Sequence, residues 1–445
     1  MTGRRSGSSA AFYQLKMNSS TSGFPDGSKL LAGVPGVCYN PDKPNRHSDR
    51  RKASQMDVKT LVELFDERPL ENVLGVEIFH PDKVIYVCPE GTPEHAQRQL
   101  KDYFDHRGIA TAMEFLYVNI YDTEKILALF RSVLKEHPDA VMDITGGTDA
   151  VLFAAGFACS EAAIPVVTYS RTMNKFYSIQ NAPSMHGYVC DITFSVEDCF
   201  LMAGGSMRKG RVDNSILFRY MEDIDPFFAV FLKYRRQWDR IVTYIQRISP
   251  AREDGTYSLS VQGDYIVKGE QGARLTAPEE ALRDLEKIRM ISGLKIVPEE
   301  SVEFYFRDPQ IRAWLRDVGS VLELYIYKAC LDTGIFNDVR TSAIVDWNGD
   351  EKDHAVSNEL DVMCTQGITP VFISCKTCMI RTEALNELAV LRDRFGGQIA
   401  RAAIVTAEPA GASARNRAAE LNIRIIDLND LQEGNVAESI RSLMK

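Results

Sequence analysis

The stretch Ala140-Val-Met-Asp-Ile-Thr-Gly-Gly-Thr-Asp149 decides the fold class of the first half of the chain. The apolar run that ends at Ile144 is typical of a buried strand, and the almost wholly apolar residues from Asp149 to Ala162 predict a helix. Strands that alternate with helices of this length predict a parallel sheet with helices on both faces, a Rossmann-like domain over residues 56–199. Its other strands are expected at 83–88, 114–120 and 165–169, its other helices around 96–108 and 126–134, and a hairpin strand at 176–179.

The composition is that of an ordinary globular protein with two or three domains. The chain has 445 residues, of which 45% are apolar and 25% are charged. Its nine cysteines are too sparse for a disulfide scaffold and indicate a reducing, cytoplasmic environment. No apolar run reaches the roughly 18 residues of a membrane helix, so we expect no membrane contact. The net charge of −9 argues against a protein that coats nucleic acid, but it allows a nuclease, whose site gathers carboxylates for metal ions.

Residues 1–55 differ from the rest of the chain in charge and composition. They carry nine basic and three acidic side chains, a net charge of +6, so the remaining residues carry −15. Many serines, glycines and prolines without an apolar period predict a disordered basic leader. These residues could form an arm that binds nucleic acid. We favour instead a disordered leader without such a role, or a protein that begins at Met56.

The middle of the chain, residues 200–308, gives a weaker pattern. A helix is expected over 216–248 and another over 278–290, followed by strands at 294–297 and 302–306. A helix followed by a hairpin suits a winged-helix module, and a helical connector fits equally well.

The last third, residues 309–445, predicts a second α/β domain with a mixed sheet. A long helix over 311–330 precedes strands at 340–347, 359–364 and 371–376, with a turn expected at Asn348-Gly349 after the first of them. Helices at 382–395 and 412–421 then alternate with strands at 402–406 and 424–428.

The first candidate site is the segment from Asp143 to Thr148. In open α/β sheets, ligands bind outside the carboxyl ends of the strands, and a helix N-terminus presents unpaired N–H groups to an anion. Thr145 and Thr148 add hydroxyl groups, and Arg171 follows the next strand. The spacing matches neither a dinucleotide fingerprint nor a P-loop. The residues alone therefore support a tight turn and a ligand loop about equally.

The second candidate site combines Asn358-Glu-Leu-Asp361 with Ser374-Cys-Lys376. A tight turn between the two strands can place Asp361 beside Lys376, as a metal-dependent phosphodiesterase requires. A cross-strand ion pair on a solvated face is the alternative. Apolar flanking residues favour a functional site, because charged groups are rarely placed in central strands without a role.

These two segments resemble a known combination of domains. The loop Thr145-Gly146-Gly147-Thr148 on a Rossmann-like domain resembles the CARF (CRISPR-associated Rossmann fold) domain. Residues 358–362, 372–376 and 416–427 resemble a restriction-endonuclease-like PD-(D/E)xK domain. Together, over roughly residues 56–431, they are similar to the two-domain ancillary nucleases of type III CRISPR systems.

The resemblance implies an allosteric nuclease of antiviral defence. In a homodimer, two facing loops would bind a cyclic oligoadenylate, expected to be cyclic tetra-adenylate. Binding would activate cleavage of single-stranded RNA or DNA, with nicking of duplex DNA, in the presence of Mn²⁺ or Mg²⁺. Asp361 would be a metal ligand, Lys376 would orient the attacking water, and Glu323 would take the place of the helical Glu of the superfamily. The implied ligand contacts are Thr145, Gly146, Gly147, Thr148, Asp149 and Arg171.

The chain departs from the superfamily pattern at Ser374, where a carboxylate is expected two residues before the lysine. A hydroxyl is a poor ligand for a hard cation. Some members take this Glu from the following helix, about three turns beyond the Lys. Here that helix carries Glu383, which suits the helix dipole, and Glu387, which has no such explanation and is our preferred replacement. Glu359 and Glu383 are further candidate metal ligands.

Two other functions stay open. One is a transcription regulator that responds to cyclic oligoadenylate and has a degenerate nuclease domain. The other is a plain restriction-type endonuclease whose N-terminal domain serves only for dimerisation. Retention of Asp361 and Lys376 favours catalysis over the regulator. The sequence fixes neither the ring size of the activator nor the preference for RNA or DNA.

Overall fold

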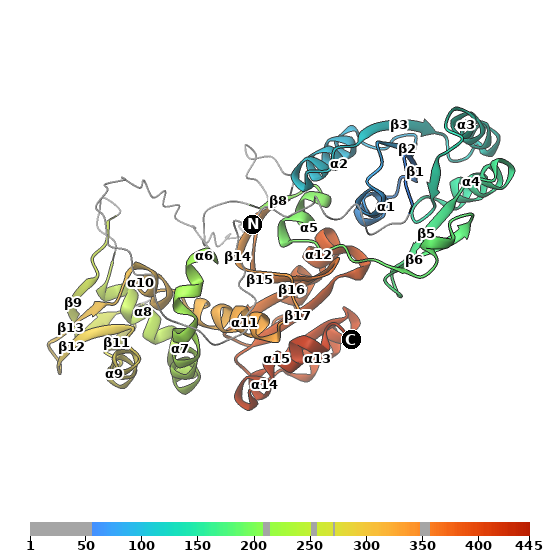
Figure 1. The fold of residues 1–445 in the computed structure, drawn as a ribbon. Helices are drawn as coiled ribbons and strands as arrows, with labels where there is room; N and C mark the ends of the chain where they lie inside the picture. The colour runs from blue at the N-terminus through green and yellow to red at the C-terminus, as the bar shows by residue number, and fades with distance from the viewer. Residues whose placement is uncertain (1–55, 208–213, 251–255, 270–271, 348–356) are drawn as a thin grey trace, which may run out of the picture. The chain divides into compact units, whose positions relative to one another are not determined.

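The computed structural model describes residues 56–207, 214–250, 256–269, 272–347 and 357–445, so the expected leader and the expected turn at Asn348-Gly349 lie outside it. The described chain divides into two compact units (Figure 1). The smaller contains residues 240–316, and the larger contains residues 56–239 and 317–445. No helix among the described residues is long and apolar enough to cross a membrane.

A seven-stranded sheet forms the N-terminal part of the larger unit, in the order β3-β2-β1-β4-β5-β6-β7. The strands from β3 to β5 are parallel, as predicted, and β6 and β7 extend the sheet as antiparallel strands. Leu61 and Tyr86 face one apolar core, whereas Val62 and Ile85 face a second core that helices α3 and α4 cover. The elements are β1 (Thr60–Leu64), η2 (Pro69–Asn72), α1 (Leu74–Phe79), β2 (Lys83–Pro89), α2 (Glu94–Arg107), β3 (Ala112–Val118), α3 (Thr123–Glu136), β4 (Val141–Asp143), α4 (Asp149–Ala162), β5 (Val166–Ser170), β6 (Lys175–Gln180), η3 (Pro183–Met185) and β7 (Tyr188–Val189).

A six-stranded mixed sheet, ordered β18-β17-β16-β15-β14-β8, forms the C-terminal part of the larger unit. It confirms the expected second α/β domain, in which β14, β15 and β16 are antiparallel and β16, β17 and β18 are parallel. Strand β8, from the middle of the chain, pairs with the end of β14. The elements are α5 (Val196–Met202), β8 (Ser206–Met207), α6 (Asn214–Leu217), η4 (Phe218–Tyr220), α7 (Met221–Tyr234), η5 (Arg235–Gln237), α11 (Ser320–Thr333), β14 (Asp338–Asp346), β15 (Ser357–Gln366), β16 (Thr369–Lys376), α12 (Thr382–Gly396), η7 (Gly397–Ile399), β17 (Arg401–Thr406), α13 (Ala412–Glu420), β18 (Ile423–Ile426), α14 (Leu428–Glu433) and α15 (Val436–Ser442).

The smaller unit combines short helices with a three-stranded antiparallel sheet, β12-β13-β9, and a two-stranded one, β10-β11. Strands β12 and β13 form the expected hairpin, and β9 pairs with β13 on its other edge. Helix α9 buries Leu282 and Leu285. The elements are α8 (Trp238–Ile248), which leads into the unit, β9 (Ser260–Asp264), β10 (Ile266–Lys268), β11 (Arg274–Thr276), α9 (Glu279–Lys287), β12 (Ile291–Val297), β13 (Ser301–Phe306) and α10 (Pro309–Leu315).

Two expected helices are interrupted in the structure. The helix expected over 311–330 is wrong as a single element, because it consists of α10 and α11. The Asp317 carboxylate accepts hydrogen bonds from the backbone N–H and the hydroxyl of Ser320, which begin α11 as a new helix. The helix expected over 216–248 is likewise divided, with 3-10 turns before α7 and after it.

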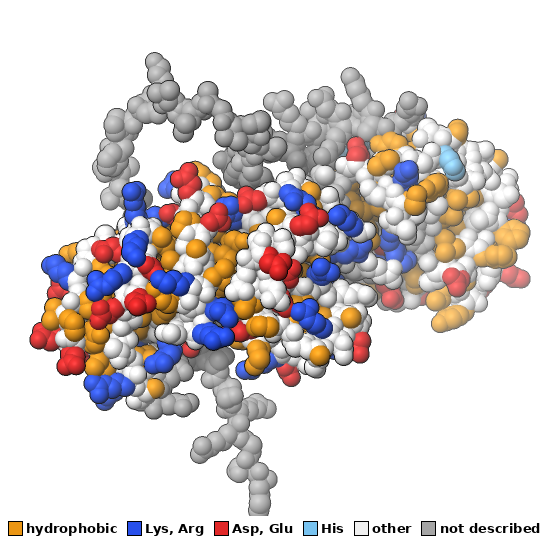
Figure 2. Space-filling model, turned by 90° about the horizontal axis from the view of Figure 1, so that it is seen from below, with side chains coloured by type: hydrophobic (Ala, Val, Ile, Leu, Met, Phe, Trp, Pro, Cys, Tyr) orange, Lys and Arg blue, Asp and Glu red, His pale blue; other side chains and the backbone are white. Residues whose placement is uncertain are grey.

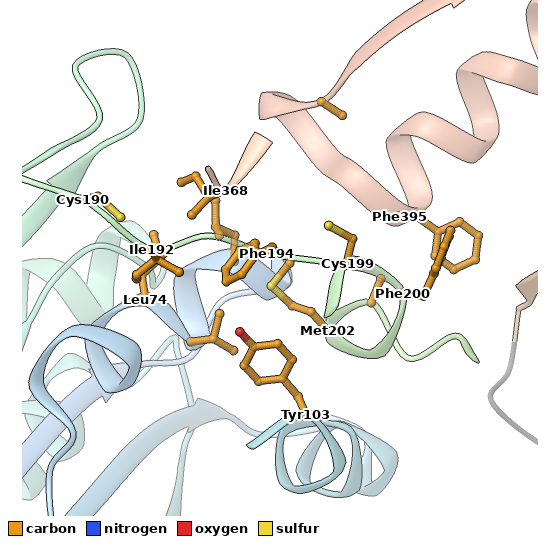
Figure 3. Packing of buried hydrophobic residues seen from close by; sticks show 14 of the residues in the cluster. Leu74, Tyr103, Cys190, Ile192, Phe194, Cys199, Phe200, Met202, Ile368 and Phe395 are labelled. Carbon is orange, nitrogen blue, oxygen red and sulfur yellow. The ribbon is translucent and has the colours of Figure 1, made fainter. Parts of the chain in front are cut away.

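A buried segment around α5 joins the two sheets of the larger unit (Figure 3). The Phe194 N–H donates to the carbonyl of Gly367 at 2.9 Å, and the Val196 N–H donates to Asp338 Oδ2 at 2.9 Å. Phe200 on α5 packs its ring against that of Phe395 on α12, with centroids 5.1 Å apart. The segment therefore belongs to the cores of both sheets.

An ionic cluster fixes α5 to the first sheet. The Arg107 guanidinium donates to Glu77 Oε1 at 2.7 Å and to Asp198 Oδ2 at 3.0 Å, and the Tyr103 hydroxyl also donates to Glu77. The three charged side chains are only 2–3% exposed. A buried charge that loses its partner is costly, so these contacts depend on one another.

We predict that Arg107→Ala lowers the free energy of unfolding by about 3–5 kcal/mol, because it leaves two buried carboxylates unpaired. Arg131→Ala is the matched control, since Arg131 makes a similar double contact with Glu161 but both side chains are about half exposed. That control should lose at most about 1 kcal/mol. Urea titrations measure both, and equal losses would contradict a special role for the buried cluster.

Candidate functional site

The Thr-Gly-Gly-Thr loop lies at the point where the strand order of the first sheet reverses. Parallel strands β1 and β4 are neighbours in the centre of that sheet, and the loop follows the carboxyl end of β4. Such a switch point is where open α/β sheets bind ligands. Gly147 has a φ of +95°, and a Cβ on this residue would lie 2.8 Å from Leu64 Cβ, so only glycine fits the loop.

The loop is held from three sides by hydrogen bonds. Asp143 accepts from the backbone N–H of Thr145 at 2.8 Å and from its hydroxyl, and the Tyr169 N–H donates to that hydroxyl at 2.9 Å. The Gly147 N–H donates to Asp66 Oδ2 at 3.2 Å. Thr148 precedes α4 and its side chain makes no capping hydrogen bond, and both Thr148 and Asp149 are exposed.

Arg171, the predicted ligand contact, is engaged at both ends of its guanidinium. It forms an ion pair with Glu71, which is 2% exposed, and its Nη1 donates to Gln398 Oε1 at 2.7 Å. Gln398 belongs to η7, which follows α12 in the second sheet's domain. Arg171 thus links the neighbourhood of the loop to the C-terminal domain.

Two carboxyl groups lie beneath the loop: Asp143, which begins the first candidate segment, and Glu63, which no sequence motif indicated. Glu63 on β1 pairs in register with Asp143 on β4, and both are fully buried. Burial raises the pKa of Glu63 well above its usual value, and the neighbouring Asp143 raises it further. Burial also raises the pKa of Asp143 to about 6, although the bonds from Thr145 oppose this shift. Both shifts favour the protonated forms of these two carboxyl groups.

The second site gathers around Asp361 on β15. Asp361 Oδ2 accepts from the Cys375 N–H at 2.6 Å and from the Ser374 hydroxyl at 3.0 Å, and lies 3.6 Å from Lys376 Nζ. The structure thus brings Asp361 and Lys376 together, as the strand spacing predicted. The Ser374 hydroxyl, at the position of the missing carboxylate, orients Asp361.

Glu323, in the first turn of α11, faces the same site. Its Oε2 accepts from the Ser342 hydroxyl at 3.1 Å, and Ser342 has a strained φ of +51° in β14. Burial, the charge of Asp361 and that of Asp317 raise the pKa of Glu323 to about 8, and Glu359 adds to the effect. The carboxylates are therefore close enough to perturb one another. Within the described ranges, however, no three His, Cys, Asp or Glu side chains form an assembled metal site.

The two carboxylates of α12 lie apart from this group. Glu387 Oε1 accepts from Asn358 Nδ2 at 2.9 Å, and Asn358 lies three positions before Asp361 on β15. Glu387 thus contacts the strand that carries Asp361, whereas Glu383 is exposed at the start of α12. The metal-binding role of both residues stays a prediction.

Comparison with known proteins supports the expected family resemblance. Residues 313–444 match the family model of the Card1-like endonuclease domain. No curated protein matches the chain. Protein VC1899 from Vibrio cholerae has a similar structure, with a TM-score of 0.66 and 18% identity over 85% of this chain and 97% of that one. Can2 from Sulfobacillus thermosulfidooxidans, solved in complex with cyclic tetra-adenylate, has a TM-score of 0.62 and 17% identity over 86% of this chain and 97% of its own. The two-domain α/β architecture is therefore the one these structures share.

We predict that Glu63→Gln changes how stability depends on pH. Because the folded protein raises the pKa of Glu63, its carboxyl contributes stability at low pH that is lost as the pH rises toward the raised value. The amide cannot ionise, so the variant should gain stability relative to wild type between pH 5 and pH 8. Urea titrations at both pH values measure this gain. The exposed Glu67→Gln serves as the control, and an equal difference from wild type at both pH values for Glu63→Gln would refute the prediction.

Proposed function

We propose that this protein is a metal-dependent nuclease of type III CRISPR defence that cleaves single-stranded RNA or DNA when cyclic tetra-adenylate binds the Thr-Gly-Gly-Thr loop. The observation that carries the proposal is the placement of Asp361, Lys376 and the half-buried Glu323 around one point of a Card1-like endonuclease domain. Carboxylates held this close together repel each other, so a cation that binds between them would be favoured.

The residues of this site suit a divalent cation. Asp361 and Glu323 supply carboxylate oxygens, and Glu387 and Glu359 are the further candidate ligands. Mg²⁺ and Mn²⁺ commonly use one or two carboxylates and keep several water ligands, so a complete protein cage is not needed. A bound ion would lower the pKa of an attacking water and offset the negative charge of the phosphate.

The side chains of the chain perform the remaining steps. The contacts from Ser374 and Cys375 fix the Asp361 carboxylate in one orientation. Lys376, with its ammonium beside Asp361, orients the attacking water and stabilises charge on the phosphate oxygens. Glu323 would hold the ion through its carboxylate; its partial burial and the charges of Asp361 and Asp317 raise its pKa to about 8, and a nearby cation would favour its ionised form.

The loop suits the activator because a ring of phosphates needs N–H donors that approach closely. The proposed contacts Thr145, Gly146, Gly147, Thr148 and Asp149 lie at the start of α4. Thr145 donates its N–H and hydroxyl to Asp143 and so positions the loop, whereas the exposed Thr148 offers its hydroxyl to the ligand. A phosphate at this loop would compete with Asp66 for Gly147 and with Glu71 for Arg171. Release of Arg171 would break its bond with Gln398 and so signal to the C-terminal domain.

We predict that Asp361→Asn abolishes activator-dependent cleavage, with a loss of about 10²-fold or more. Purified protein is incubated with Mn²⁺ or Mg²⁺ and labelled single-stranded RNA or DNA, with and without cyclic tetra-adenylate. Glu387→Gln should lose as much activity as Asp361→Asn, and Glu383→Gln only part of it. Normal turnover of Glu387→Gln in saturating Mn²⁺ would show that the second carboxylate comes from Glu383, Glu359 or Glu323 instead. Equal inactivity of wild type and Asp361→Asn under every condition would favour the transcription regulator.

We further propose that the protein is a homodimer that pairs through α4. Phe153 and Phe157, on one face of α4, are 63% and 52% exposed, and their rings pack 4.9 Å apart. Figure 2 shows exposed hydrophobic side chains on the part of the surface at its right. Figure 1 shows that α4 and its end of the first sheet lie on that side. Pairing through α4 would bring two Thr-Gly-Gly-Thr loops to one symmetric ligand, since the loop begins this helix.

We predict that Phe153→Glu with Phe157→Glu shifts the protein from dimer to monomer. Buried carboxylates would oppose the apolar interface, and the monomer should bind cyclic tetra-adenylate more weakly. Sedimentation velocity at micromolar concentration measures the mass. Phe218→Glu is the control, because Phe218 is 69% exposed but lies on η4. A strictly monomeric wild type, with and without the ligand, would contradict the proposal.

A further inference from the structure

A cavity of about 550 Å³ lies in the larger unit, apart from the Thr-Gly-Gly-Thr loop. His95 and Arg98 of α2, the residues that follow α5, Trp347 after β14 and Arg394 of α12 line it. Neither the sequence motifs nor the site around Asp361 account for these side chains.

The cations of this cavity lack carboxylate partners. Neither Arg98 nor Arg394 forms an ion pair with any residue that the structure describes, and His95 forms none either. The Arg394 guanidinium lies over the ring of Phe395, 5.6 Å from its centroid. Asp102 is the one carboxylate of the lining. Unpaired guanidinium groups around a cavity indicate an anionic ligand.

The cavity also offers an aromatic surface. Trp347 is half-buried, packs edge-on against Phe395 with centroids 5.6 Å apart, and donates its indole N–H to Asn358 Oδ1 at 2.7 Å. The other two tryptophans, Trp238 and Trp314, are 1% and 5% exposed and belong to the cores. Arginine together with a fixed indole is the combination that binds the phosphates and bases of single-stranded nucleic acid.

The indole is connected to the candidate nuclease site. Asn358, its hydrogen-bond partner, also binds Glu387 and lies three positions before Asp361. Three residues of extended strand span about 10 Å. A nucleic acid that leaves the cavity along β15 would therefore pass about 10 Å of strand before it comes level with Asp361.

We propose that this cavity binds single-stranded nucleic acid and directs it to Asp361 and Lys376. Arg98 and Arg394 contact phosphates, and Trp347 stacks on a base. The inference rests on the proposed nuclease function, for which it names a substrate-binding surface outside the residues that perform the cleavage.

The test measures binding rather than cleavage. Asp361→Asn protein is titrated into labelled single-stranded RNA and DNA, with and without cyclic tetra-adenylate, and fluorescence anisotropy reports binding. Adding Arg98→Glu and Arg394→Glu should weaken binding by about 10-fold or more at low salt, and should reduce the slope of log K against log salt by about 1.4. Arg401→Glu with Arg424→Glu is the matched control, since both side chains are exposed strand residues outside the cavity and the change in charge is the same.

Trp347 provides a second readout that does not change the charge. Binding should quench its fluorescence, and Trp347→Leu should remove the quenching and weaken binding about 5-fold or more. Binding by the Arg98/Arg394 variant equal to that of the control pair, or full quenching in Trp347→Leu, would overturn the inference. If wild type fails to cleave yet these variants lose binding, the proposed nuclease function fails while the binding site stands.

Discussion

The Arg107 guanidinium, held between Glu77 and Asp198, is the contact on which the larger unit depends. It fixes α5 to the first sheet, and the residues just before α5 bond to Gly367 and Asp338 of the second sheet. An ion pair that is this deeply buried adds little net free energy, but it penalises every arrangement that separates its members. It therefore specifies how the loop of one sheet lies with respect to the carboxylates of the other.

A series of hydrogen bonds and ion pairs connects the Thr-Gly-Gly-Thr loop to the second domain. Asp66 accepts from Gly147 in the loop and is bound bidentately by Arg68, while Arg171 joins Glu71 to Gln398. Burial opposes ionisation of Asp66, but the bonds from Arg68 outweigh it and lower its pKa. Asp66 thus accepts from the Gly147 N–H, and Glu71 pairs with the Arg171 guanidinium. An anionic ligand at the loop would need these same two donors. A ligand can break these two contacts only if it binds the donors more strongly than Asp66 and Glu71 do.

The sequence predicted most elements of both sheets, because apolar runs and glycine turns mark them clearly. It missed β1, the central strand of the first sheet, because Glu63 interrupts the apolar run with a charged residue that the fold buries. No sequence pattern indicated the contacts between the two domains. Arg171 was expected as a ligand contact, and its bond to Gln398, 227 positions later, was not predicted. The adjacency of Asp361 and Lys376 followed from strand period and turn length, but the contacts that hold Glu323 required the kink at Ser342.

The substitution at Ser374 changes how the site around Asp361 must work. With a carboxylate at this position, two acidic groups would compete for Lys376 and repel each other. The hydroxyl instead donates to Asp361 Oδ2, which also receives the Cys375 N–H, so this oxygen is already occupied. Asp361 then offers its other oxygen, and the second carboxylate has to come from another element. Glu323 is half-buried, has a pKa raised to about 8, and would gain most from a nearby cation, whereas Glu387 contacts the same strand through Asn358. Under the proposed function, the order of the site would depend on a bound cation to a greater degree than in a site with three preassembled carboxylates, and an activator that shifts α12 would move Glu387, the proposed ligand on that helix.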